Sequence, residues 1–140
     1  MVGLGAGARS YTTTLHYSTE YAVGRAGVLN IISDYNHRSH DDFSAADYGC
    51  ELDSQEQKRR YLLKSLLRAD GLDLAAYQRF FSSDAFADFP QLSELREEDL
   101  AVEEHSHFRL NSRGLELSDA IGTWLWSPAV SEKMNDFALV

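Results

Sequence analysis

The sequence predicts an α+β fold that is mainly helical. Residues 54–69 form the longest run in which leucines recur on one helical face with basic residues between them. Further apolar residues at three- and four-residue spacing follow this run, and the alternating pattern of residues 100–110 is typical of a strand pair. With 140 residues the chain has room for one domain and is short for two.

The chain begins with a glycine-rich segment in which Gly3, Gly5 and Gly7 alternate with small or apolar residues. This pattern suits backbone that lies close to a ligand or a neighbouring element. It formally fits the dinucleotide fingerprint, but that fingerprint should follow a strand and open a helix. Here it runs into residues 10–14, which favour an extended chain. A glycine-rich edge strand or loop is therefore preferred to a nucleotide-binding unit.

The next segment contains one predicted helix, over residues 26–35, and a polar stretch after it. His37 and His40 have metal-ligand spacing, but this spacing brings two imidazoles together only on a helix, so a solvated linker is favoured. Cys50 is the only cysteine, which excludes an internal disulfide and indicates a reducing compartment. A nucleophilic cysteine needs a nearby base, which one sequence cannot show, so we expect Cys50 to be buried by packing.

The helix over residues 54–69 is expected to face the core, with Leu66 at the centre of its apolar stripe. Ser54 and Gln57 have the spacing of a capping box, which predicts the start of the helix.

The following residues predict a second helix over Leu74–Phe81 and a third that runs to Glu97 and is interrupted by Pro90. Strands at residues 100–104 and 108–110 flank a polar turn, and Ser112 is expected to cap a last helix over residues 113–126. Three helices, a hairpin and a closing helix make a winged-helix arrangement over residues 53–126.

The negative charge is concentrated in the second half of the chain. The net charge is −9, of which residues 1–70 carry −1 and residues 71–140 carry −8. Residues 84–104 hold eight acidic side chains against Arg96 alone, so we expect no binding to nucleic acid or anionic membrane.

No apolar run approaches the ~20 residues of a membrane span, and the N-terminus lacks a signal-peptide pattern, so a cytoplasmic protein is expected.

Two blocks carry a family resemblance. Residues 3–10, GLGAGARS, look like a GLGAGAxS stretch, and a second block comprises Arg60 with Lys64-Ser65-Leu66-Leu67, Gly71-Leu72-Asp73, residues 89–100 and Leu110 with Gly114. In this order they resemble the C-terminal part of the oxygen-independent coproporphyrinogen III oxidase-like radical SAM proteins, a group that includes haem chaperones. The resemblance implies a remnant strand and helix of the barrel edge at residues 1–40, a linker at 41–52, a winged-helix domain at 53–127 and a tail at 128–140.

The resemblance also implies a cofactor site. Gly3, Gly5, Ala6 and Ala8 would line the S-adenosylmethionine site when the rest of the barrel, expected as the partner, is present. The family holds a [4Fe–4S] cluster with three closely spaced cysteines, whereas this chain has one, so the chain alone is expected to be inactive. The implied role is that of an accessory domain in a porphyrin- or haem-related oxidoreductase. We call the protein that would contain both this chain and the barrel the parent, and a tetrapyrrole is its possible substrate. Arg9 stands where the family usually has His, which indicates a divergent subgroup.

A second hypothesis is a stand-alone protein-interaction or haem-binding module, with His16, His105 or His107 as an axial ligand. Exposed polar side chains are the simpler interpretation of these histidines. Without the barrel, the glycine-rich strand is expected to leave an open edge, and self-association through residues 1–38 is expected to follow.

Overall fold

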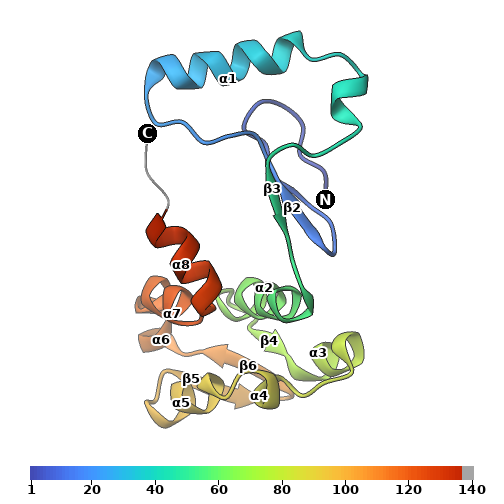
Figure 1. Ribbon diagram of the computed structural model, residues 1–140. Helices are drawn as coiled ribbons and strands as arrows, with labels where there is room; N and C mark the ends of the chain where they lie inside the picture. Colours follow the sequence, from blue (N-terminus) through green and yellow to red (C-terminus); the bar gives the residue numbers. More distant parts are fainter. Residues whose placement is uncertain (137–140) are drawn as a thin grey trace. The chain divides into compact units, whose positions relative to one another are not determined.

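A computed structural model describes residues 1–136 of the chain. These residues form two compact units: unit 1 comprises Met1–Gln57 with the described residues from Glu132, and unit 2 is Lys58–Ser131. The described residues hold eight α-helices, which make up about half of the chain, and two three-stranded antiparallel sheets (Figure 1). The α+β prediction is confirmed.

Unit 1 contains a three-stranded sheet and one long helix. The strands are β1 (Ser10–Tyr11), β2 (Leu15–Tyr17) and β3 (Gly49–Glu51), arranged in the order β1-β2-β3. Helix α1 (Arg25–His37) confirms the helix predicted over residues 26–35 and extends it at both ends. Residues 41–52, expected to be a linker, contain the short 3₁₀-helix η1 (Asp41–Phe43) and strand β3.

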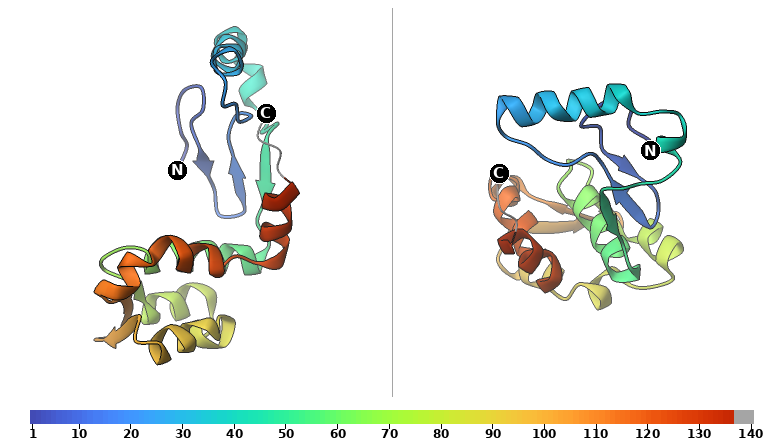
Figure 2. Two further views of the ribbon diagram at one scale, coloured as in Figure 1. Left: turned by 90° about the vertical axis from the view of Figure 1, so that its left-hand side faces the viewer. Right: turned by 45° about the horizontal axis from the view of Figure 1, so that its top comes forward.

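Unit 1 buries no apolar side chain among its described residues. Ser10 is its only described residue in the buried class, and α1 has none. Figure 2 shows why: within this unit α1 lies beyond one end of the strands and does not cover a face of the sheet. Val28, Leu29 and Ile32 of α1 therefore remain about half exposed.

Unit 2 is built from short helices around the second sheet. Its elements are the remainder of α2 (Ser54–Leu66), β4 (Leu72–Asp73), α3 (Leu74–Phe81), α4 (Ala85–Asp88), α5 (Gln91–Glu97), β5 (Ala101–Glu104), β6 (His107–Leu110), α6 (Ser112–Glu116), α7 (Ser118–Trp124) and the start of α8 (Pro128–Asp136). The sheet order is β4-β6-β5, so the predicted hairpin has a third strand. Two residues are too short for an alternating pattern, and β4 was therefore missed.

The buried apolar side chains of the described residues all lie in unit 2. They form one cluster, which includes Leu62, Leu66, Tyr77, Phe89 and Phe108. Leu66 is fully buried, so the prediction that it lies in the core is confirmed. Its burial follows from the stripe that it shares with Leu62 on α2, because residues four apart lie on one face of a helix.

Two predicted helix caps are wrong by one residue. The Asp53 carboxylate, not the Ser54 hydroxyl, accepts the Glu56 amide at 2.8 Å, because Ser54 is already the first residue of α2. The side chain of Asn111, not that of Ser112, accepts the Gly114 amide at the start of α6. In both cases the residue just before the predicted cap offers an oxygen at the better position.

Two predicted helix lengths also need correction. The helix predicted over residues 54–69 ends at Leu66, where the Arg68 amide turns to the Ser65 carbonyl. The helix predicted over residues 113–126 is broken at Leu117 into α6 and α7. Pro90 separates α4 from α5, as expected of a residue without an amide hydrogen. The segment expected as a tail begins with α8, whose first residue, Pro128, is suited to a first turn.

Candidate functional site

The glycine-rich segment is folded back on its own chain. Three of its amides donate to side-chain oxygens of unit 1: Gly3 to Ser10 Oγ at 3.0 Å, Gly5 to the Tyr35 hydroxyl at 3.1 Å and Gly7 to Thr19 Oγ1 at 3.2 Å. The Tyr11 amide donates to the Met1 carbonyl, and the Met1 amino group donates to the Tyr11 carbonyl, both at 2.8 Å. The open backbone edge expected in this segment is therefore wrong, because the segment satisfies these groups within unit 1.

Two glycines in this segment are required by backbone conformation. Gly5 has a φ of +106° and Gly7 a φ of +78°, values that L side chains rarely adopt. A Cβ atom at either position would meet no atom within 4 Å, so crowding is not the reason for glycine. The Ala8 amide donates to the Gly5 carbonyl at 3.1 Å and closes the turn.

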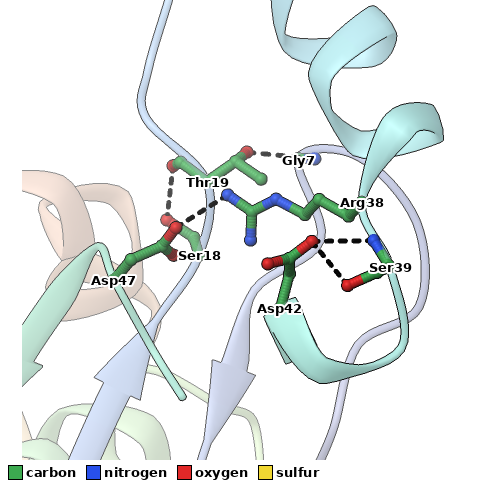
Figure 3. Close-up of polar contacts among 7 residues, drawn as sticks. All are labelled: Gly7, Ser18, Thr19, Arg38, Ser39, Asp42 and Asp47. Atoms are coloured by element: carbon green, nitrogen blue, oxygen red, sulfur yellow. Dashed lines mark hydrogen bonds and ion pairs between the residues drawn. The ribbon is translucent and has the colours of Figure 1, made fainter. Parts of the chain in front are cut away.

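A polar cluster lies next to Gly7 (Figure 3). Thr19 accepts the Gly7 amide through its hydroxyl, and its carbonyl accepts the Ser18 hydroxyl at 2.8 Å. Arg38, at the end of α1, donates to Asp47 at 2.8 Å. Arg38, Asp47 and Thr19 line a small open cavity of about 330 Å³.

The same close-up shows a second polar contact, after α1 (Figure 3). Asp42 accepts the Ser39 amide at 2.7 Å and the Ser39 hydroxyl at 2.9 Å. These hydrogen bonds, the amide first, lower the pKa of Asp42 because they favour its charged form. The contact shapes the turn between α1 and η1.

A larger groove of about 930 Å³ also lies within unit 1. Its helical side is apolar and is formed by Val28, Ile31 and Ile32 of α1. Sheet residues on its other side include His16 of β2 and Cys50 of β3. An open apolar groove with a few polar groups is typical of a site for a small molecule or a partner segment.

His16 and Cys50 are directly opposite each other in the β2–β3 register, and the His16 ring stacks on the Tyr11 ring at a centroid distance of 4.4 Å. Cys50 is exposed, so the prediction that packing buries it is wrong. As a residue of a strand at the margin of the sheet it has no layer to cover it. The sequence could not show this pairing, because the two residues lie on strands separated by α1.

The residues predicted to bind cofactors are only partly brought together. Ala6 lines the 930 Å³ groove, whereas Gly3, Gly5 and Ala8 shape the adjacent turn and are not among its wall residues. Of the candidate haem ligands, His16 lines the groove, whereas His105 and His107 lie at the β5–β6 turn of unit 2. Within residues 1–136 no three His, Cys, Asp or Glu side chains are grouped so that they could hold a metal ion.

Comparison with known families gives one match. Residues 52–117 match the family model of the HemN C-terminal domain. This region of the chain is similar to a HemN C-terminal domain. This confirms the resemblance over the second block, from the residue before the α2 cap to the end of α6. No curated protein and no solved structure matched the chain.

The region that matches the HemN C-terminal domain contains a buried ionic network. Lys58 Nζ and the Tyr77 hydroxyl each donate to Asp88 at 2.8 Å, one to each carboxylate oxygen. The side chains of Lys58 and Asp88 are only 14% and 12% exposed. The network joins α2, α3 and α4, and its three residues are outside both cavities described above. Its position therefore indicates a structural role.

The same network shifts two pKa values. Burial alone would raise the pKa of Asp88, but hydrogen bonds from Lys58, Ser83 and Tyr77 outweigh it and hold this pKa below its ordinary value. Burial, and then the hydrogen bond to Asp88, raises the pKa of Tyr77 well above its ordinary value. Both shifts favour an ionised Asp88 and a neutral Tyr77.

None of the described helices is long and apolar enough to cross a membrane.

Proposed function

We propose that this chain is the C-terminal accessory part of a HemN-like radical SAM protein related to porphyrin or haem metabolism, and that alone it carries out no radical chemistry. The observation that supports this most is the HemN C-terminal domain at residues 52–117, downstream of the glycine-rich segment that the resemblance assigns to the barrel. In this proposal residues 1–40 belong to the barrel edge, and catalysis is a property of the assembled barrel.

The domain is further proposed to be a winged helix that serves in packing. Helices α2, α3 and α5 with the β5–β6 hairpin support this assignment, and β4 adds a strand to the wing. The exposed side chains of α5, of the β5–β6 hairpin and of the turn between them are mainly acidic and include Glu97, Glu98, Asp99, Glu103 and Glu104. A surface of this charge repels phosphate, which supports a role other than binding nucleic acid.

The cofactors of the parent fit the present residues only in part. A [4Fe–4S] cluster needs several thiolates, and one cysteine does not fit it. For S-adenosylmethionine, Ala6 offers a groove wall, but the amides of Gly5 and Gly7 already donate to Tyr35 and Thr19. The chain would thus contribute a shaped wall to the site, while other parts of the barrel would supply the polar contacts.

The proposal is tested by anaerobic reconstitution of the purified chain with iron and sulfide. We expect no bound cluster and no 5′-deoxyadenosine from S-adenosylmethionine. About four irons per chain together with cleavage would overturn the proposal.

A second arm adds a HemN-like barrel that lacks this C-terminal region and measures S-adenosylmethionine binding by calorimetry. Binding should strengthen when the chain is added. Ala6→Asp should remove the gain, whereas Ala45→Asp, at an exposed position outside the groove, should preserve it. Unchanged binding on addition of the wild-type chain would contradict the proposed role.

A haem-binding module is the second candidate, because His16 lines an apolar groove directly opposite Cys50. Haem binding would place an axial imidazole from His16 beside apolar walls from α1. Added haemin should then give a shifted Soret band that His16→Ala removes and His107→Ala retains. A Soret band that is the same in all three proteins would reject this candidate.

A further inference from the structure

The sheet of unit 1 has one covered and one uncovered edge. Beside β1, the Met1 and Tyr11 backbones exchange two hydrogen bonds of 2.8 Å. At the opposite end of the order β1-β2-β3, no further strand pairs with β3 among residues 1–136. All three β3 residues are exposed. β3 is therefore an edge strand, which presents backbone groups that can pair with another chain.

The hydrogen-bond register defines what this edge offers. The Leu52 amide donates to the Thr14 carbonyl at 2.7 Å, and the Ser18 amide donates to the Tyr48 carbonyl at 3.0 Å. Bonded pairs alternate along an antiparallel ladder, so residues 48, 50 and 52 direct their backbone groups toward β2. Gly49 and Glu51 direct theirs away from it, which leaves two amides and two carbonyls along the edge.

We propose that two copies of this chain pair through β3 about a two-fold axis at Cys50. In an antiparallel pairing Gly49 of each copy lies opposite Glu51 of the other copy. Each of these two pairs exchanges two backbone hydrogen bonds, so the interface contains four. The two Cys50 residues then face each other in a non-hydrogen-bonded pair, with Cα atoms about 4.5 Å apart.

Several features of the sequence favour a second copy as the occupant. Each Glu51 carboxylate faces a glycine of the other copy, so no like charges are directly opposite and no side chain blocks the approach. The same three residues serve both copies, which closes the assembly as a dimer. Pairing would also stabilise unit 1. This unit buries no apolar side chain among its described residues, and a small sheet without such a core gains stability from additional strands.

This interface lies outside residues 1–38, so it differs from the self-association expected from the sequence, which stays a prediction. It also goes beyond the proposed function, because it does not require a barrel. A barrel strand that paired with β3 would compete with the second copy.

The only cysteine of the chain gives a direct test. A diazene oxidant accepts two electrons and two protons from the two Cys50 thiols, which become one disulfide, and the pairing places these thiols within disulfide range. We expect rapid formation of a covalent dimer on a non-reducing gel, and a dimer of the reduced chain in sedimentation equilibrium.

Two variants that keep a single thiol serve as matched controls: Cys50→Ser with Ser44→Cys, and Cys50→Ser with Glu51→Cys. Ser44 is exposed but outside the edge strand, and Glu51 is one residue from the axis. Both should cross-link at least about tenfold more slowly than Cys50, because their thiols are not brought face to face. Equal rates for all three would show random collision and would overturn the proposal. Faster cross-linking of the Glu51→Cys variant would overturn the register.

Glu51→Pro removes one outward amide and leaves the bonds to β2 intact, since proline is tolerated on the free side of an edge strand. It should convert the reduced dimer to monomer. A reduced wild-type chain that stays monomeric at several hundred micromolar, with Cys50 cross-linking no faster than the controls, would overturn the proposal whatever the fold of this variant.

Discussion

Asp88 is the position where a single-atom change should be most informative. Asp88→Asn removes the charge that pairs with Lys58 and accepts from Tyr77, while it preserves the volume of the side chain. Breaking a buried ion pair costs about 3–5 kcal/mol, because the remaining charge stays buried without compensation. Lys58 is 14% exposed and retains a little water, so we expect about 3 kcal/mol in the free energy of unfolding.

The measurement is urea unfolding, monitored through tryptophan fluorescence. Both tryptophans, Trp124 and Trp126, lie in unit 2, so the signal reports on the unit that contains the network. The matched control is Glu103→Gln, whose partner Arg96 is 3.9 Å away and half exposed, and for which we expect less than about 0.5 kcal/mol. A loss below about 1 kcal/mol for Asp88→Asn, with an unchanged m-value, would show that the network contributes no more than a surface pair.

Further predictions concern the same unit. Leu66→Ala should cost about 2–5 kcal/mol, and an unchanged urea midpoint would refute its burial. Gly114→Ala should destabilise the unit, since a Cβ there would overlap the Leu100 carbonyl; equal thermal midpoints for variant and wild type would contradict this. The lowered pKa of Asp88 stabilises the fold above about pH 4, and this contribution is lost as pH falls through the folded-state pKa, so the acid-side loss should be shallower in Asp88→Asn. The raised pKa of Tyr77 acts oppositely: its contribution is present below about pH 10 and is lost as pH rises further, and Tyr77→Phe should remove that alkaline loss. Random duplex DNA at physiological salt should show no retardation by micromolar protein; a clear shift would contradict the charge argument.

The sequence was most informative where periodicity and burial agree. The stripe of α2 predicted that Leu66 is buried, and the spacing of residues 74–81 predicted α3 with its observed bounds. Both elements belong to the unit with a closed core, where a one-sided apolar pattern has a surface to pack on. The α+β class followed from these helices together with the alternating pattern of residues 100–110, which predicted the β5–β6 pair.

The sequence was least informative in unit 1, where long-range pairing and local turns decide the structure. The expected open edge was misplaced because nothing in the composition shows that Met1 folds back onto Tyr11. Cys50 was expected to be buried because the sequence shows no partner for a nucleophilic role, yet it is exposed on an edge strand. The groove beside His16 depends on a strand register that periodicity cannot specify.

The uneven distribution of buried apolar side chains also determines how the protein responds to heat. The heat-capacity change of unfolding arises mainly from apolar surface that becomes hydrated. For a fully packed chain of 140 residues it would be about 2 kcal/mol/K, but the buried cluster lies within the 74 residues of Lys58–Ser131, which correspond to about 1 kcal/mol/K. Calorimetry on the monomeric chain should therefore give a heat-capacity change of unfolding typical of a protein about half as long. The free energy of unfolding should then vary only weakly with temperature.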